Sequence, residues 1–174
     1  MDILQSILDI AKKNKVQFLV IGGHAINAIG YARQTADLDL LVSKSNREFW
    51  CCTLKSFRYE QLQDHEVFAR FKSLDLAAWP INLMFVEQNV FEQLLYSATL
   101  VNFGNCQVYI PSLKHMIALK LHALKQRQEH REARDIIDIQ ELLKIESLPT
   151  HELRQLCQKY DRLDLYEQFE RFCT

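Results

Sequence analysis

Short apolar runs and paired glycines divide the start of the chain into alternating elements. The run Phe18–Ile21 has the length of a buried strand. Two glycines follow it, and the apolar segment from His24 to Ile29 then predicts a short helix that ends at Gly30. A second apolar run predicts a strand at 37–42. We therefore expect the order strand, glycine turn, helix, loop and strand.

The next part of the chain continues this alternation of helical and strand periods. Residues 2–14 have a single apolar stripe at helical spacing, made by Ile3, Leu4, Ile7, Leu8 and Ala11. Aromatic and β-branched runs predict further strands. The remaining expected elements are a helix at 45–56, strands at 67–71 and 81–86, a helix at 87–97, and a hairpin at 100–110 that turns at Gly104-Asn105.

From Pro111 onward the pattern is helical throughout. Apolar residues have core spacing in a first helix after Pro111, in a second at about 129–144, and in a final helical stretch from Pro149. We expect an α/β (α+β) fold with a small mixed sheet. Residues 1–110 are expected to form its α/β core, and residues 111–174 a C-terminal helical segment.

Composition narrows the possible classes of protein. The chain has 174 residues, 48% of them hydrophobic and 25% charged, which is ordinary for a globular protein. The formal net charge of −1 excludes a globally basic nucleic-acid binder. Five cysteines without paired C-x-x-C motifs fit reduced thiols rather than a disulfide framework or a zinc site. No basic leader and no membrane-length apolar stretch is present, so a cytoplasmic protein without membrane contact is expected.

The second predicted strand carries the candidate chemistry. Alternate strand residues share a face, so Asp37 and Asp39 are expected to project to the same side. Two neighbouring carboxylates repel each other unless they meet water or share a cation, and Mg²⁺ (or Mn²⁺) held together with substrate phosphates suits such a pair. Gly22 and Gly23 permit a close approach of a phosphate to the backbone. The simpler alternative is a polar strand end with two solvated aspartates.

These motifs resemble a known superfamily. Gly22-Gly23, thirteen further residues and then Asp37-Leu38-Asp39 resemble the signature of the DNA polymerase β-like nucleotidyltransferases. The segment from Arg33 to Asp39 is most similar to a bacterial branch that includes abortive-infection toxins of toxin–antitoxin systems. The resemblance implies a small mixed-sheet nucleotidyltransferase core, followed by a helical segment that closes one side of a cleft.

The resemblance also implies roles for individual residues. Asp37 and Asp39 would be catalytic metal ligands, and the nucleoside triphosphate would be bound by Gly22, Gly23, Arg33, Thr35, Lys120 and Arg131. Asp135 and Asp138 also match the branch's helical pattern. The alternative for these helical charges is an ordinary solvated face with ion pairs between neighbouring turns.

One position departs from the family pattern. The family usually has a third carboxylate on a later strand, and Asn82 stands at that catalytic position here. An amide oxygen can coordinate a metal, but it cannot act as a general base near neutral pH. Three interpretations stay open: an enzyme that works with Asp37 and Asp39 alone, an enzyme in which Asp75 substitutes, or a degenerate member that binds without turnover.

The sequence therefore supports a ranked set of functions. The first is a metal-dependent nucleotidyltransferase that moves a nucleoside monophosphate from an NTP to a hydroxyl of an RNA such as tRNA, of a protein or of a small molecule. The second is a catalytically degenerate binding module, with an antitoxin as the possible partner. A third is an oligomeric scaffold that uses Phe169 and Phe172 at its interface.

Overall fold

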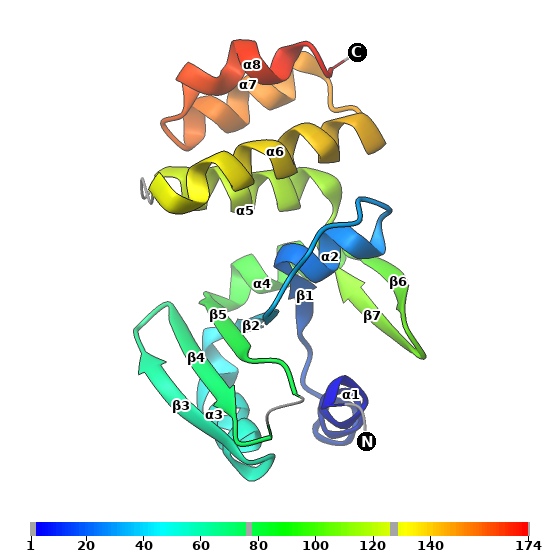
Figure 1. Ribbon diagram of the computed structural model, residues 1–174, viewed down its shortest axis with the longest axis vertical. Helices are drawn as coiled ribbons and strands as arrows, with labels where there is room; N and C mark the ends of the chain where they lie inside the picture. Colours follow the sequence, from blue (N-terminus) through cyan, green and yellow to red (C-terminus); the bar gives the residue numbers. More distant parts are fainter. Residues whose placement is uncertain (1–2, 76–77, 126–128, 174) are drawn as a thin grey trace. The chain divides into compact units, whose positions relative to one another are not determined.

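Two compact units make up the chain, which is described by a computed structural model (Figure 1). The structure describes residues 3–75, 78–125 and 129–173, and the side chains of residues 129–131 lie outside this description. The first unit comprises residues 1–28 and 32–111, and the second comprises residues 29–31 and 112–174. Each unit is described separately below.

A five-stranded mixed sheet forms the centre of the first unit. Its strand order is β1-β2-β5-β4-β3. β2 and β5 pair in parallel, whereas the other neighbours are antiparallel. This sheet confirms the expected mixed α+β fold class. The strands are β1 (Leu19–Ile21), β2 (Leu38–Ser43), β3 (Tyr59–Asp64), β4 (Phe68–Ser73) and β5 (Ile81–Val86).

Four helices and a hairpin surround this sheet (Figure 1). α2 packs against β1 and β2, and α3 against β3. The stripe of α1 is buried through Leu4, Ile7 and Ala11, as its spacing predicts. The bounds are α1 (Ile3–Asn14), α2 (Gly22–Ala28), α3 (Arg47–Ser56) after a 3-10 turn η1 (Lys44–Asn46), α4 (Gln88–Tyr96), and the hairpin strands β6 (Thr99–Phe103) and β7 (Cys106–Ile110).

The structure differs from the sequence prediction at two places in this unit. α2 begins at Gly22 itself, so the predicted glycine turn is the first turn of the helix. The strand β3 was not predicted, because its segment is mostly polar. β3 lies at the edge of the sheet and pairs with β4 on one side. Most of its side chains are exposed to water, so it lacks the apolar run by which a central strand is recognised in a sequence.

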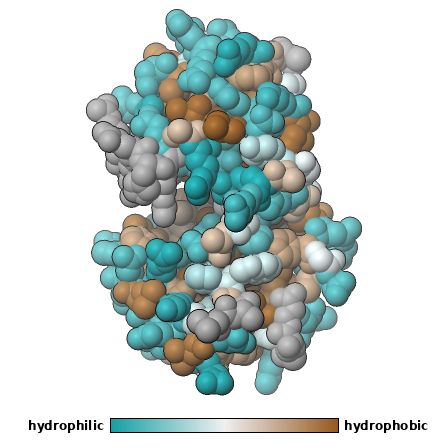
Figure 2. All heavy atoms as spheres, in the orientation of Figure 1, coloured by the Kyte–Doolittle hydropathy of each residue, from teal (hydrophilic) through white to brown (hydrophobic). Residues whose placement is uncertain are grey.

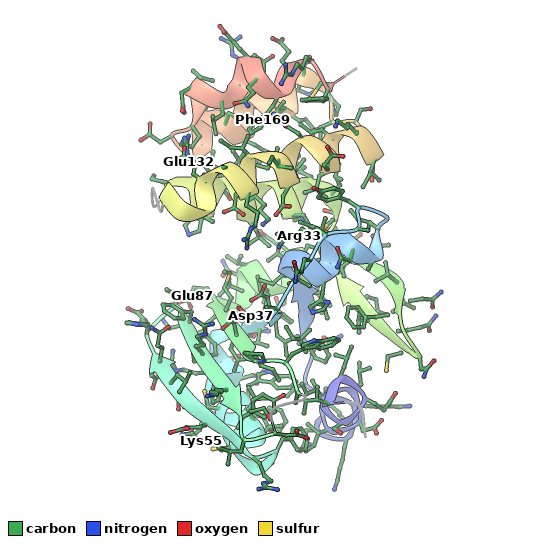
Figure 3. All side chains as sticks on the ribbon, viewed as in Figure 1. Arg33, Asp37, Lys55, Glu87, Glu132 and Phe169 are labelled. Carbon is green, nitrogen blue, oxygen red and sulfur yellow. The ribbon has the colours of Figure 1, made fainter. Side chains whose placement is uncertain are left out.

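In the second unit, all the regular elements among the described residues are helices. α5 (Leu113–Lys125) pairs with α6 (Glu129–Ile145), and α7 (Thr150–Lys159), a 3-10 turn η2 (Leu163–Leu165) and α8 (Tyr166–Glu170) complete it. Its core includes Phe169, which is 0% exposed (Figure 3). The scaffold hypothesis is wrong in this respect, because a fully buried ring is not available as an interface residue.

The distribution of hydrophilic and hydrophobic residues on the surface is typical of a globular protein. On the face shown in Figure 2 hydrophilic residues predominate, and the hydrophobic residues are scattered among them. In the described part of the chain, no helix combines the length and the apolar character needed to cross a bilayer.

Candidate active site

The start of α2 fits tightly against the strand that carries the two aspartates. Gly22 has φ +66°, a left-handed conformation that favours glycine. A Cβ atom at Gly22 would fall inside the carboxylate of Asp39. A Cβ atom at Gly23 would lie 2.6 Å from Thr35 Oγ1 and 2.7 Å from Arg33 Nη2. Both glycines therefore lie in close contact with side chains of predicted site residues.

A side chain of α2 fixes the loop that leads into β2. The backbone N–H of Arg33 donates to Asn27 Oδ1 at 2.8 Å, and Asn27 Nδ2 donates back to the Arg33 carbonyl at 2.9 Å. Two residues further on, Thr35 Oγ1 donates to the Asp37 carbonyl at 3.4 Å. Arg33 and Asp37 lie on the same extended segment before β2 (Figure 3). Asn27 was not predicted as a site residue, because its partner is a backbone group and leaves no mark on the sequence.

Asp37, Asp39 and Asn82 meet on one face of the sheet. The parallel pairing of β2 and β5 sets Asp39 opposite Asn82. The Asn82 amide Nδ2 donates to Asp39 Oδ1 at 2.8 Å and lies 3.5 Å from Asp37 Oδ2. Both aspartates therefore project to the same side of the sheet. Asn82, the predicted third catalytic position, contacts both of them.

Arg70 is a further member of this group that the sequence analysis did not include. It lies on β4 directly opposite Asn82, and its Nη2 atom is 3.7 Å from Asp37 Oδ2. The Arg70 side chain is 41% exposed and that of Asp37 is 29% exposed. The strand containing Arg70 was predicted, but its register with β5 was not, so nothing in the sequence placed this guanidinium beside the aspartates.

The alternative third carboxylate, Asp75, lies in another place. It follows the end of β4 and lines a shallow hollow with Phe57, Arg58, Ser73 and Leu74. Arg70, five residues earlier, is the β4 residue that faces Asn82. The position of Asp75 beyond the strand end therefore gives no support to its substitution for a carboxylate at Asn82.

His24, directly after the two glycines, is part of an aromatic cluster. It is 7% exposed, and its ring centroid lies 4.6 Å from that of Trp79 and 5.2 Å from that of Phe103. Burial, followed by the nearby positive charge of Arg33, lowers the pKa of the His24 imidazole. Within the described residues its Nε2 atom has no hydrogen-bond partner. The neutral ring therefore packs as an aromatic group.

In the second unit, Lys120 is held between two aspartates of α6. Its ammonium lies 2.6 Å from Asp135 Oδ1 and 2.6 Å from Asp138 Oδ2. The three side chains are 15%, 12% and 1% exposed, respectively. The Lys120 charge is thus compensated in this structure, and a phosphate would compete with two carboxylates for it. The side chain of Arg131 lies outside the described residues.

The donor set of the aspartate group suits a hard divalent cation. Asp37 and Asp39 supply carboxylate oxygens, and rotation of the Asn82 amide would direct its oxygen at the same point. Among the described residues, no group of three or more His, Cys, Asp and Glu side chains has metal-binding geometry. The group therefore offers two carboxylates and one amide, which fits Mg²⁺ or Mn²⁺ better than a metal that prefers nitrogen or sulfur.

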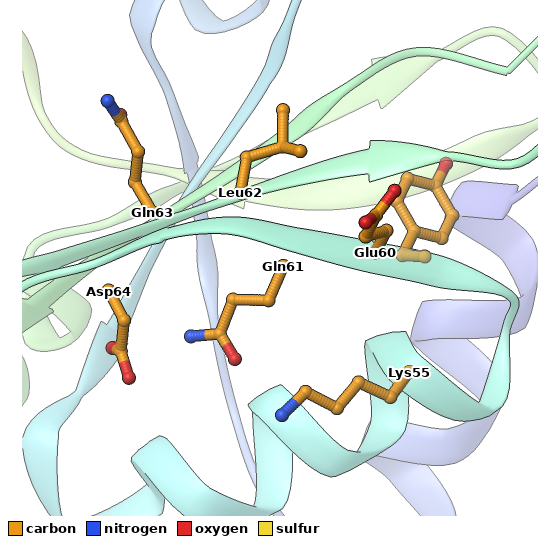
Figure 4. A pocket seen from close by; sticks show the side chains of 7 residues that line it. Lys55, Glu60, Gln61, Leu62, Gln63 and Asp64 are labelled. Carbon is orange, nitrogen blue, oxygen red and sulfur yellow. The ribbon is translucent and has the colours of Figure 1, made fainter.

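A shallow hollow elsewhere in the first unit is unrelated to this chemistry. It has a volume of about 560 Å³ and is lined by Lys55 and the edge-strand residues 59–64 (Figure 4). Neither Asp37 nor Asp39 lines this hollow. We therefore assign the candidate active site to the aspartate group.

Similar folds occur among solved nucleotidyltransferases. An antigenic nucleotidyltransferase-like protein from Paracoccidioides brasiliensis is 17% identical with a TM-score of 0.61, and the alignment covers 98% of this chain and 91% of that one. The lincosamide antibiotic adenylyltransferase LnuA, solved with lincomycin bound, is 15% identical with a TM-score of 0.58 over 82% and 95% of the two chains. ANT(2")-Ia, solved with adenylyl-2"-tobramycin, is 12% identical with a TM-score of 0.61 over 97% and 95%. At these identities the likeness establishes the fold alone.

A family sequence model provides the decisive comparison. Among curated proteins no significant match is found. The family described as "Nucleotidyl transferase AbiEii toxin, Type IV TA system" matches residues 56–166, more than half of the chain. The match begins after the Asp37 to Asp39 motif, so it is independent of the motif on which the initial resemblance rested. With the fold, it confirms that resemblance: the chain belongs to the AbiEii family of nucleotidyl transferase toxins of type IV toxin–antitoxin systems.

Proposed function

We propose that this protein is a metal-dependent nucleotidyltransferase that moves a nucleoside monophosphate from an NTP to an acceptor hydroxyl. The observation that carries the proposal is the meeting of Asp37, Asp39 and Asn82 on one sheet face, directly against Gly22. Family membership supports nucleotidyl transfer in general. The arrangement of these side chains supports the choice of this site.

The chain's own residues bind and orient the substrate. The absence of a Cβ at Gly22 and Gly23 lets Asp39, Thr35 and Arg33 lie directly against the start of α2, beside which the triphosphate would bind. The guanidinium of Arg33 and the hydroxyl of Thr35 both lie against Gly23 and add charged and neutral donors there. Asn27 holds the Arg33 backbone through two hydrogen bonds, which fixes the course of the loop that carries both donors.

Asp37 and Asp39 would hold the divalent cation, with Mg²⁺ or Mn²⁺ as the candidate. When bound, the cation neutralises the charge that develops on the α-phosphate and the leaving group. The acceptor oxygen forms a bond to the α-phosphorus, the bond from that phosphorus to the α,β-bridging oxygen breaks, and pyrophosphate leaves. Asn82 cannot accept the acceptor's proton, so that proton has to pass to another group or to water.

Transfer of label from α-³²P-NTPs, with Mg²⁺ or Mn²⁺, onto RNA including tRNA, cell protein and small molecules tests the proposal. Wild type is expected to label one class of acceptor, which identifies it, and Asp39→Asn is expected to abolish the label. Glu60→Gln makes the same chemical change on the exposed edge strand and serves as the control. Equal labelling by wild type and Asp39→Asn would contradict the proposed site.

A second candidate function is a nucleotidyltransferase-like binding module without turnover. The observation that favours it is the Asn82 amide, which stands at the third carboxylate position and donates to Asp39 and, at 3.5 Å, to Asp37 without any cation. If this function is correct, only Asn82→Asp transfers label, or neither wild type nor Asn82→Asp does. The effects of the wild-type protein then persist in the Asp39→Asn variant. If the chain acts as a transferase toxin, its expression without an antitoxin slows growth and Asp39→Asn does not.

A further inference from the structure

The sheet of the first unit is packed on one face and open on the other. Burial alternates along β4 and β5, and Ala69 and Leu83 on the packed face are 0% exposed. The Arg70 side chain, in contrast, is 41% exposed and Met84 is 36% exposed. Because alternate strand residues share a face, and Arg70 stands opposite Asn82, all three of Arg70, Asn82 and Met84 belong to the open face.

Arg70 and the groups proposed to bind the triphosphate lie on opposite sides of the aspartates. The strand order is β1-β2-β5-β4-β3, and α2 packs against β1 and β2 (Figure 1). The start of α2 lies against Asp39 and against the guanidinium of Arg33. Across β2 from there, Asn82 of β5 is the neighbour of Asp39, and Arg70 of β4 is the neighbour of Asn82.

The direction of transfer decides what meets Arg70. In such a transfer the attacking and the leaving oxygens stand roughly in line with the phosphorus. Pyrophosphate would leave toward α2, since the proposed triphosphate-binding residues lie there. The acceptor oxygen therefore approaches from the opposite side, across β5 and β4, where Arg70 is the first side chain beyond Asn82.

The guanidinium of Arg70 is available to bind an anion. Its Nη2 atom lies 3.7 Å from Asp37 Oδ2, which is longer than a hydrogen bond. A cation bound to Asp37 would weaken this attraction further, because it offsets the charge of the carboxylate. A guanidinium has five N–H donors in a planar fork, which matches the oxygens of a phosphate or a carboxylate.

We infer that Arg70 binds an anionic group of the acceptor and thereby selects acceptors that carry such a group near the modified hydroxyl. The inference rests on the proposed function, because it concerns the acceptor of that reaction. Phe68 and Met84, two residues away from Arg70 and Asn82 on their strands, pair on the same open face and provide an apolar surface beside the anion. Arg70 is thus a specificity-determining residue for the acceptor.

Isothermal titration calorimetry, with Mg²⁺ and a non-hydrolysable NTP analogue filling the donor site, tests this inference. Two pairs of probes differ by one anionic group. Adenosine and adenosine 5′-monophosphate represent a nucleotide acceptor, and a neutral serine-containing peptide and the same peptide with one aspartate represent a protein acceptor. In one of these pairs the anionic probe is expected to bind wild type at least about tenfold more tightly, the effect of a charge-assisted hydrogen bond.

Variants of Arg70 assign the preference to this side chain. Arg70→Gln is expected to remove the preference for the anionic probe, while the affinity for the NTP analogue changes much less. Arg70→Lys is expected to retain part of the preference, because an ammonium keeps the charge but not the planar fork. The matched control is Lys72→Gln, which removes a positive charge two residues along the same strand, opposite Glu60, and is expected to retain the whole preference.

The outcomes separate this inference from the proposed function. Absence of a preference in both pairs, or an equal preference in wild type and Arg70→Gln, would overturn the role of Arg70 and leave metal-dependent transfer intact. A parallel loss of affinity for the NTP analogue in Arg70→Gln would also overturn it, because Arg70 would then serve the donor site. Label transfer that persists in Asp39→Asn would contradict the proposed function, and the inference would fail with it.

Discussion

Gly22 lies directly against the carboxylate of Asp39, so close that a Cβ atom at Gly22 would overlap the Asp39 oxygen Oδ2. We predict that Gly22→Ala strongly reduces nucleotidyl transfer, because the new methyl group displaces the Asp39 carboxylate. An alanine held at the positive φ of Gly22 also adds strain of about 1–2 kcal/mol to the folded state of the variant. Label transfer and urea unfolding measure the two effects separately.

Gly104 provides a matched control for the backbone strain. It has φ +56°, close to the +66° of Gly22, but nothing lies within 4 Å of the position of its Cβ. Gly104→Ala is therefore expected to lose a similar part of its stability from strain while it retains transfer. Equal losses of transfer in both variants, at equal folded fractions, would show that the contact with Asp39 is not needed.

The clamp between Asn27 and the Arg33 backbone gives a second prediction. Asn27→Ala removes both hydrogen bonds, which is expected to cost about 1–3 kcal/mol in the free energy of unfolding. Transfer is expected to fall further than stability, since Arg33 and Thr35 lose their fixed approach to Gly23. The measurement is the apparent KM for the NTP at a temperature where the variant is folded.

Asn14 offers the control for this clamp. Its Nδ2 also donates to a backbone carbonyl, that of Ile10, but on the exposed end of α1. Asn14→Ala is expected to leave the KM unchanged. An Asn27→Ala protein with wild-type KM would show that the loop keeps its position by other contacts.

The Lys120 group in the helical unit gives a third prediction, for stability. Lys120→Met leaves Asp135 and Asp138 buried without their shared cation, and removal of one partner from a buried ion pair costs about 3–5 kcal/mol. Chemical denaturation measures this loss. Lys114→Met on the same helix is the control, because its pair with Glu152 is largely exposed and no comparable loss is expected. Similar stabilities of the two variants would contradict a structural role for Lys120.

The buried ring of His24 gives a fourth prediction, for the pH dependence of stability. Its folded-state pKa is lowered below the ordinary 6.5 by burial and by Arg33. The unfolded chain therefore binds more protons below about pH 6.5, and the stability present above that pH falls on acidification. His115 contributes in the same direction, because burial and Lys114 lower its pKa as well.

His24→Phe separates these two contributions. Phenylalanine keeps an aromatic ring against Trp79 and Phe103 but does not titrate. Thermal unfolding of wild type and His24→Phe is measured between about pH 7.5 and about pH 5, the range in which histidine titrates. On acidification, Tm is expected to decrease less in the variant than in wild type. Parallel pH profiles for both proteins would contradict the assignment to His24.

Much of the local structure was predictable because it depends on near neighbours in sequence. The apolar run before Gly22 and the run after Asp37 identified two strands, and the period of two correctly placed Asp37 and Asp39 on one side. Helical spacing identified α1 and its buried stripe. Gly104 predicted the turn of the hairpin of β6 and β7, and it has the positive φ that this turn needs.

The sequence by itself thus determined most of the elements, although not the edge strand β3, and the pair of aspartates, whereas tertiary structure alone decided which groups face that pair. Arg70 reaches Asp37 only because β4 and β5 pair in one register, and a shift of one residue would turn its side chain to the other face. Lys120 meets Asp135 and Asp138 only because α5 and α6 are two paired helices rather than one. Strand register and helix pairing are fixed by contacts between distant segments, and those contacts leave no periodic signal in the chain itself.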